Sequence, residues 1–413
     1  MSQNKTATIW NRNFIFFTTG MELSVIAQGL LRFALPLYIL RLTGDPAILG
    51  TVLSISVVSF ILLSPFGGFI TDRHSKRRMV FVLNGLSAAA LLIYALSFSL
   101  GSIVITTIAI LLFFQAIDAF LMPMNEAAFP FLVPEGTLTK ANSITLLLNT
   151  FSAIGAPVLG GFLLGNYGLV PILWISIVLF LFAGFIQSAA RIPMPKQEKK
   201  HSNLIKTVWC DFRDSARYLV HENRTMGKII LIMALYTMVL SPLLSVALPV
   251  LVTIHFGGGE TIMGIIQGIV MAGGALSIIL VNVLGNRLNI KKIRLLLMVC
   301  SLALVPTIPA FTLNGTSMIS YVLMIASLFV VFGCLTIIGL LTWTFLGERT
   351  PENMLGKVIA FAMAMMGVGQ GLGEFFYGLF FDQLVARPAI AFGIIAVAAL
   401  GIALWANVKQ RLE

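Results

Sequence analysis

Residues 68–78 read Gly-Phe-Ile-Thr-Asp-Arg-His-Ser-Lys-Arg-Arg, and this stretch joins two long apolar ones, 48–70 and 79–98. The same alternation continues in both directions along the 413 residues, of which 58% are hydrophobic and only 10% charged. A soluble domain carries about 25% charged residues, so this chain has too few to cover a water-facing surface. The sequence therefore predicts an integral membrane protein, for which a length-based count of soluble domains does not apply.

Twelve stretches reach the length of about 20 mostly apolar residues that a membrane helix needs. They are 14–40, 48–70, 79–98, 102–122, 142–164, 170–189, 229–254, 262–284, 295–313, 318–345, 358–381 and 389–408. The first stretch is too long for the apolar part of a cleavable signal, so we expect it to remain as the first span. The predicted fold class is an all-α membrane protein with twelve transmembrane helices.

The basic residues indicate how the chain lies in the membrane. If the N-terminus is cytoplasmic, 24 of the 27 Lys and Arg residues fall in cytoplasmic segments, and the other three are Arg32, Arg41 and Arg387. This asymmetry follows the positive-inside rule and predicts a multi-pass protein of the cytoplasmic (inner) membrane with both termini in the cytoplasm. It also accounts for the formal net charge of +11 without a nucleic-acid partner.

Short matches at a fixed offset indicate an internal repeat. Ala-Leu-Pro at 34–36 recurs at 247–249, and Pro-Glu-x-x-Leu-x-Lys at 134–140 recurs at 351–357. Two six-span halves of the same orientation predict a parallel repeat, with substrate bound between the halves near the midplane. The expected domains are an N-terminal six-helix half at 1–190, a cytoplasmic linker at 191–226 and a C-terminal six-helix half at 227–413.

The linker shows helical periodicity. Apolar residues between 205 and 220 recur at three- and four-residue spacing, while Lys206, Arg213 and Arg217 occupy other faces. This pattern predicts an amphipathic helix on the inner leaflet. A solvated linker with a chance pattern is the alternative.

Residues 68–78 resemble the G-x-L-A-D-R-x-G-R-K-R signature of the major facilitator superfamily, with Ser75 where the family usually has Gly. The matching positions are Gly68, Asp72, Arg73, Lys76 and Arg77. The resemblance implies the major facilitator fold, with two six-helix pseudo-symmetric halves, and we expect the motif to act in conformational switching. Physically, Gly68 permits close helix approach and the basic cluster holds the loop in the cytoplasm. The second-half counterpart is degenerate, since Asn286 replaces the Asp.

Residues 123–143 and 351–358 look like the drug-efflux branch that includes macrolide efflux proteins and the enterobactin exporter. This resemblance implies export of a small amphipathic compound, such as a drug, macrolide or siderophore-like molecule, by proton antiport with alternating access. Many family members carry an Arg in span four that is implicated in proton handling. Here Gln115 occupies that place and Asp118 stands where Gly is usual, so an inherited coupling scheme is in doubt.

Span five contains Gly-Ala-Pro-Val-Leu-Gly-Gly at 155–161, which resembles the antiporter motif G-P-x-x-G-G with Ala156 in place of its first Gly. Pro breaks a backbone hydrogen bond and small residues allow tight packing. We therefore expect a hinge, formed by Gly155, Pro157, Gly160 and Gly161. An ordinary small-residue packing face is the alternative.

Four charged residues lie inside the predicted spans: Glu22, Arg32, Asp118 and Glu374. Each costs about 2.5–3.5 kcal/mol on insertion scales. Glu22 and Asp118 are expected at similar depth, and two carboxylates in one apolar site cannot both ionise cheaply, so this pair is predicted to carry the coupling proton. Arg32 and Glu374, one in each half, are predicted to pair as a gate. Neutralisation of each charge by local partners is the alternative.

Polar residues on the spans are candidates for lining the substrate cavity: Gln28, Gln115, Asn149, Tyr236 and Gln370. The three cysteines and four histidines lack metal-ligand spacing, and the sequence has neither a P-loop nor an acid–base constellation. We therefore expect a monomeric transporter without metal or cofactor, whose partners are the lipid bilayer, a small-molecule substrate and protons. A lipid or lysophospholipid transporter on the same fold, without proton coupling, is the alternative, and a membrane sensor is a weaker one.

Overall fold

The computed structural model describes residues 9–73, 75–97, 103–134, 137–191, 204–285, 290–314 and 317–406. Within these ranges the chain is helical and contains no β-strand. Twelve helical segments in this part of the chain are long and apolar enough to cross a membrane. The predicted fold class and number of spans are therefore confirmed.

The chain divides into two compact units. Unit 1 comprises Met1–Tyr38 and Ser59–His201, and unit 2 comprises Ile39–Val58 and Ser202–Glu413. The units differ from the predicted halves mainly in residues 39–58, which pack with unit 2. In that unit Arg41 Nη1 contacts Glu260 Oε1 at 2.8 Å, and Gly50 and Gly378 are in close backbone contact. The division into two symmetric halves remains a prediction.

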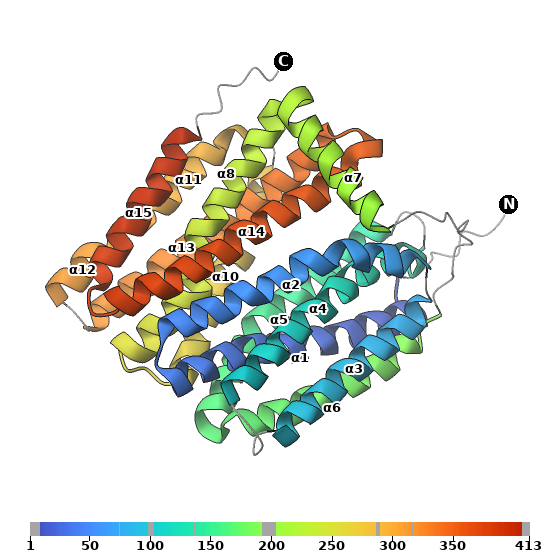
Figure 1. Cartoon of the computed structure of the whole chain (residues 1–413), viewed down its shortest axis with the longest axis horizontal. Coiled ribbons are helices and arrows are strands. Elements are labelled where there is room, and N and C mark those ends of the chain that lie inside the picture. Colours follow the sequence, from blue (N-terminus) through green and yellow to red (C-terminus); the bar gives the residue numbers. More distant parts are fainter. Residues whose placement is uncertain are drawn as a thin grey trace. The chain divides into compact units, whose positions relative to one another are not determined.

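Unit 1 is built from the first six long helices, except residues 39–58 at the end of the first and the start of the second, which belong to unit 2 (Figure 1). They are α1 (Arg12–Thr43), α2 (Pro46–Arg73), α3 (Lys76–Leu96), α4 (Ile103–Ala128), α5 (Leu138–Tyr167) and α6 (Leu169–Ser188). Helices α3 and α6 have the most extensive contact in this unit and run side by side (Figure 1). The core includes an aromatic cluster in which Phe14 and Phe17 of α1 meet Phe129 edge-on, with ring centroids 6.4 and 5.9 Å apart. Both α1 rings are fully buried.

A close approach of α1 to α6 depends on Gly20. A Cβ atom at this position would lie 2.6 Å from the Gln187 Cβ and 2.9 Å from the Ala183 carbonyl oxygen. Because neither helix backbone can yield locally, Gly20→Ala is expected to destabilise the protein by about 1–3 kcal/mol. Gly85→Ala is the matched control, because no atom lies within 4 Å of its added Cβ and Ala favours a helix by about 1 kcal/mol. Thermal unfolding in detergent measures both, and equal midpoints would contradict the packing described.

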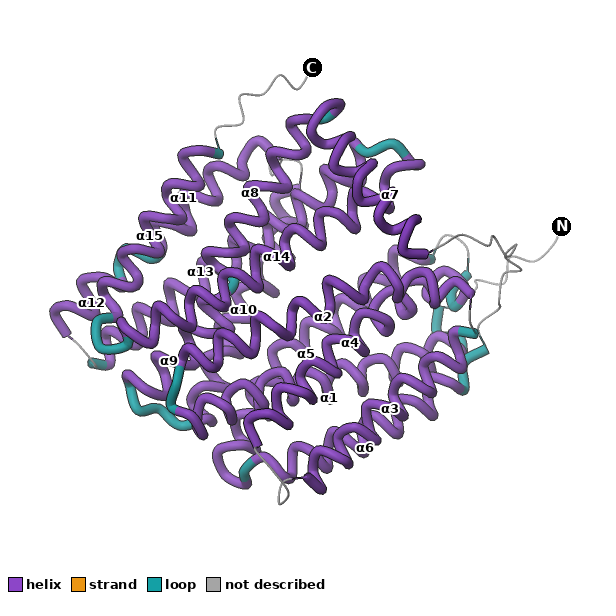
Figure 2. Tube along the Cα trace, viewed as in Figure 1, coloured by secondary structure: helices purple, strands orange, loops and turns teal. Residues whose placement is uncertain are grey.

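Unit 2 contains the remaining helices, drawn in yellow-green to red in Figure 1. They are α7 (Leu204–Arg217), α8 (Arg224–Leu240), α9 (Leu248–Val250), α10 (Glu260–Leu284), α11 (Ile293–Ala303), α12 (Thr307–Asn314), α13 (Met318–Arg349), α14 (Glu352–Leu384) and α15 (Pro388–Trp405). The largest contacts are between α10 and α13, α8 and α14, and α11 and α15. Short loops join most of the helices, as Figure 2 shows.

Two predicted spans are less regular than the sequence indicated. Span nine is divided into α11 and α12 by the turn 304–306, because Pro306 has no N–H for the helix and its ring clashes with the preceding turn. Span seven continues from α8 through two π-helical turns, η4 (Leu243–Ala247) and η5 (Leu251–His255). These turns follow Pro242 and Pro249, and π-helical turns of this kind often occur at functional sites.

Candidate functional site

Two of the three charged residues in the spans of unit 1, Arg32 and Asp118, come together between α1 and α4. Arg32 Nη2 donates to the Asp118 Oδ2, so the two residues form an ion pair. The aspartate side chain is 7% exposed, whereas that of Arg32 is 61% exposed. The pair satisfies a carboxylate in the middle of α4 that would otherwise be unpaired in an apolar environment.

Glu22 is the second buried acid of unit 1. Its Oε2 accepts a hydrogen bond of 3.1 Å from the Ser152 hydroxyl on α5. Within the described part of the chain its Oε1 is buried and has no partner, and no ion pair involves this residue. Thr18, one helical turn earlier, is also buried with an unpartnered hydroxyl. Among the described residues, Glu22 is therefore a carboxyl group without a cation, and an unpartnered hydroxyl lies one turn away on the same helix.

Glu374 occupies a similar environment in unit 2. Its Oε1 accepts hydrogen bonds from the Ser245 hydroxyl at 3.1 Å and from the Gln370 amide at 3.0 Å. The residue is 2% exposed, and its Oε2 has no partner among the described residues. A buried carboxyl group without a cation is costly to ionise, and Oε2 is the oxygen of Glu374 that the described residues leave without a donor.

The two glutamates are placed by related parts of the fold. Glu22 and Ser152 connect spans one and five, while Ser245 and Glu374 connect spans seven and eleven. These pairs of spans correspond to each other in the predicted repeat. The acid lies on the first span of the pair in unit 1 and on the second in unit 2, so the hydrogen bond between the spans is retained although the residues are exchanged.

The residues of the two predicted charge pairs have partners within their own units, and the proton-carrying pair and the gate remain predictions. Asp118 is bonded to Arg32, whereas Glu22 is bonded to Ser152, and ten residues of α1, about 15 Å of helix, separate Glu22 from Arg32. The predicted partners of the gate, Arg32 and Glu374, each have contacts inside their own unit. The ion pair of Arg32 with Asp118 is compatible with the alternative, in which each charge is neutralised by local partners. Ser152 and Ser245 were missed, because nothing distinguishes them from other serines in apolar spans.

The predicted cavity residues have several environments. Gln28, Gln115 and Asn149 are half-buried in unit 1, and Gln370 is a donor to Glu374. Tyr236 is fully buried, and its hydroxyl lies 3.5 Å from the carbonyl oxygen of Leu297. Tyr236 therefore packs in the interior of unit 2.

The basic motif at the α2–α3 connection is described only in part. The backbone of α2 ends at Arg73, but the side chains of Asp72 and Arg73 and the surroundings of Gly68 lie outside the described residues. Lys76, in the first turn of α3, is buried, with its ammonium 5.6 Å from the centre of the Phe131 ring, and Arg77 is exposed. The role of the motif in switching stays a prediction.

The predicted hinge lies in a continuous helix. Helix α5 includes Pro157, which is buried together with Gly160 and Gly161. A Cβ at Gly160 would be 3.0 Å from the Phe33 ring, and a Cβ at Gly29 of α1 would be 2.6 Å from that of Ala156. A Cβ at Gly155 would meet no atom within 4 Å. This segment therefore packs tightly on α1, and movement about it remains a prediction.

In the described ranges, no three His, Cys, Asp or Glu side chains are grouped as metal ligands would be. The site offers buried carboxyl oxygens and hydrogen-bonding groups in an apolar environment.

The chain is similar to known bacterial efflux proteins. The chain is 22% identical over 385 residues to macrolide efflux protein A of Streptococcus pyogenes, covering 91% of each chain. It is 23% identical over 400 residues to the enterobactin exporter EntS of Citrobacter koseri, covering 94% of this chain and 90% of that protein.

Solved structures show the same fold at low sequence identity. A D-xylose–proton symporter matches with a TM-score of 0.75 at 13% identity, over 95% of this chain and 96% of its own. A bacterial homologue of the iron transporter ferroportin, in an inward-facing state, matches with a TM-score of 0.70 at 18% identity, over 95% and 98%. The model of the Major Facilitator Superfamily matches residues 17–374. The chain is therefore a membrane transporter rather than an enzyme, and it belongs to the major facilitator superfamily.

Proposed function

We propose that this transporter exports a small amphipathic compound across the cytoplasmic membrane in exchange for protons. The efflux proteins among its relatives support the direction, and the distribution of basic residues supports cytoplasmic termini. The observation that carries the proton coupling is Glu22, a buried carboxyl with one unpartnered oxygen and no cation among the described residues.

In this proposal Glu22 alternates between a protonated and an ionised form during the cycle. The neutral acid is compatible with an apolar environment, and ionisation becomes favourable when water or a cationic or hydrogen-bonding substrate group reaches Oε1. The Ser152 hydroxyl holds Oε2 in both forms and so fixes the direction of the free oxygen. The ion pair of Asp118 with Arg32 leaves that acid less suited to carry a proton and gives it a positioning role between α1 and α4.

The experiment that tests the function is accumulation in proteoliposomes with an acidic lumen. A macrolide, a siderophore, a cationic dye and a lysophospholipid are offered from outside, and the proposal expects at least one of the first three to accumulate only while the pH gradient persists. Movement of the lysophospholipid alone, at a rate indifferent to the gradient, would instead establish the lipid-transport alternative.

Glu374 is proposed as a second proton-binding residue of the same cycle. Glu374→Gln keeps an oxygen that accepts from Ser245 and Gln370 but removes the titratable group. We expect this change to lower the number of protons exchanged per substrate and to leave thermal stability nearly unchanged. The flux ratio at several membrane potentials measures this number, and an unaltered ratio would exclude Glu374 from coupling.

A further inference from the structure

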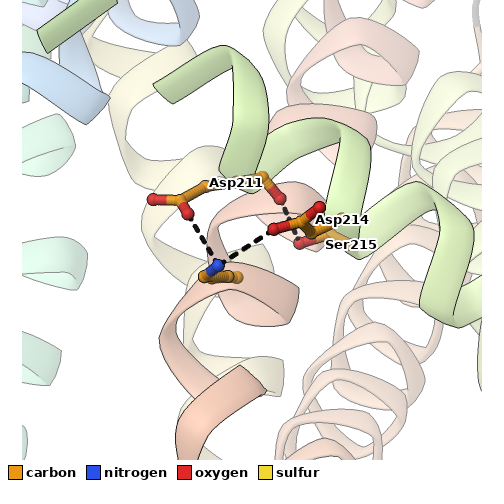
Figure 3. Close-up of polar contacts among 4 residues, drawn as sticks. Asp211, Asp214 and Ser215 are labelled. Atoms are coloured by element: carbon orange, nitrogen blue, oxygen red, sulfur yellow. Dashed lines mark hydrogen bonds and ion pairs between the residues drawn. The ribbon is translucent and has the colours of Figure 1, made fainter. Parts of the chain in front are cut away.

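Helix α7 is attached to α14 by its acidic face. The Lys357 ammonium lies 2.8 Å from Asp211 Oδ1 and 3.2 Å from Asp214 Oδ2, and Figure 3 shows both aspartates directed toward it. Beside this contact the Phe212 and Phe361 rings pack with centroids 4.7 Å apart. Lys357 belongs to the repeated Pro-Glu-x-x-Leu-x-Lys sequence, but its first-half counterpart, Lys140, is exposed. We call the contact of Lys357 with Asp211 and Asp214 the clamp, and among these two lysines only Lys357 forms it.

The other face of α7 carries a Trp and two arginines. Trp209 is 68% exposed, and Arg213 and Arg217, which follow at four-residue intervals, are also exposed. This spacing places the three side chains in one stripe along the helix. Asp211 and Asp214 lie about 140–160° around the helix from Trp209. Asp211 is thus turned away from the stripe, whereas Asp214 lies beside Arg217, about 60° around the helix, and both carboxylates are compensated by Lys357.

We propose that the stripe of Trp209, Arg213 and Arg217 binds the headgroups of anionic phospholipids. Trp side chains favour the interface between headgroups and acyl chains. Guanidinium groups bind phosphate in a bidentate manner, and basic segments at a membrane surface gain affinity from its negative potential. The exposed guanidinium groups and the compensated aspartates give the complementary charge for such a surface. The inference does not depend on which compound is transported.

Lipid binding at this stripe acts on the rest of unit 2 through the clamp. Helix α14, which Lys357 attaches to α7, also carries Glu374. Anionic lipid that holds α7 at the surface therefore stabilises the attached arrangement of α7 and α14. Loss of the clamp exposes two uncompensated carboxylates on the same helix, which weakens its attraction to an anionic surface.

The test is quenching of Trp209 fluorescence by brominated lipids in the reconstituted full-length protein. The other four tryptophans, Trp10, Trp174, Trp343 and Trp405, are replaced by Phe so that Trp209 is the sole emitter. Brominated phosphatidylglycerol is compared with brominated phosphatidylcholine at equal mole fraction and low salt. We expect phosphatidylglycerol to quench more strongly, with a preference of up to about 30-fold, and high salt to reduce the difference.

Three variants on the Trp209-only background separate the contributions. Arg213→Gln with Arg217→Gln should abolish the preference, whereas the control Lys140→Gln with Arg349→Gln, which removes the same charge from exposed positions elsewhere, should retain it. Lys357→Met should weaken the preference although both arginines are present. Asp211→Asn with Asp214→Asn should retain or strengthen it, because no uncompensated carboxylate remains.

Two results would overturn the proposal. Equal quenching of Trp209 by the two lipids in the parent protein would show contact without headgroup selection. If neither lipid quenches Trp209, the stripe faces water or is covered by protein. Aqueous iodide would quench Trp209 in the first case and not in the second.

Discussion

Replacing Glu22 with Gln is expected to abolish uphill export of substrate while downhill exchange continues. Gln retains the hydrogen bond from Ser152 and the shape of the side chain but cannot release a proton. Without a titratable group at this position, the movement of substrate is no longer linked to the pH gradient, although alternation between conformations still occurs. The measurement compares gradient-driven accumulation with substrate exchange at equal pH in proteoliposomes.

Glu348→Gln is the control for this change, because Glu348 is an exposed acid at the end of α13 and the same substitution there should have no effect. Ser152→Ala provides a second comparison, since it leaves the acid but removes the donor that orients it. We expect Ser152→Ala to shift the pH dependence of transport without uncoupling it. Full gradient-driven accumulation by the Glu22→Gln protein would exclude Glu22 as the carrier.

The second large effect is expected on stability, at the ion pair between α1 and α4. Arg32→Met leaves the carboxylate of Asp118 without its partner in the middle of a membrane helix, and we expect a loss of about 3 kcal/mol. This value is at the lower end of the range for buried pairs because the Arg32 side chain is more than half exposed. Changing both residues, Arg32→Met with Asp118→Leu, should recover most of the loss because no unpaired charge remains.

Arg41→Met is the matched control. Arg41 is as exposed as Arg32 and also pairs with a carboxylate, that of Glu260. Glu260, however, lies in the first turn of α10, where the helix N-terminus stabilises negative charge without a cation. The expected cost is therefore at most about 1 kcal/mol. Unfolding in mixed micelles measures all four proteins, and a double variant less stable than Arg32→Met would show that the pair is not the source of the effect.

The number of spans could be predicted from the sequence because length and hydropathy are sufficient to recognise a membrane helix. The ends of the spans were less accurate. Span four was predicted to end at residue 122, but α4 continues to Ala128 with Pro123 inside it.

The partners of the embedded charges depend on a property that one sequence does not contain. The depth of a residue follows from its position along a span, but the direction in which its side chain points depends on how each helix is rotated against its neighbours. The long Arg32 side chain also reaches a carboxylate on a helix that is distant in sequence. For the same reason the sequence could not identify Ser152 and Ser245 as partners of the glutamates. Their hydrogen bonds depend on how the helices pack.

The central claim, exchange of substrate for protons, is tested most directly by the pH inside proteoliposomes that contain the purified transporter and a pH-sensitive dye. Substrate added outside vesicles with an acidic lumen should raise the internal pH in step with its own uptake, and the Glu22→Gln protein should show no such change. Uptake of substrate by the unmodified protein with no change of internal pH would contradict the account.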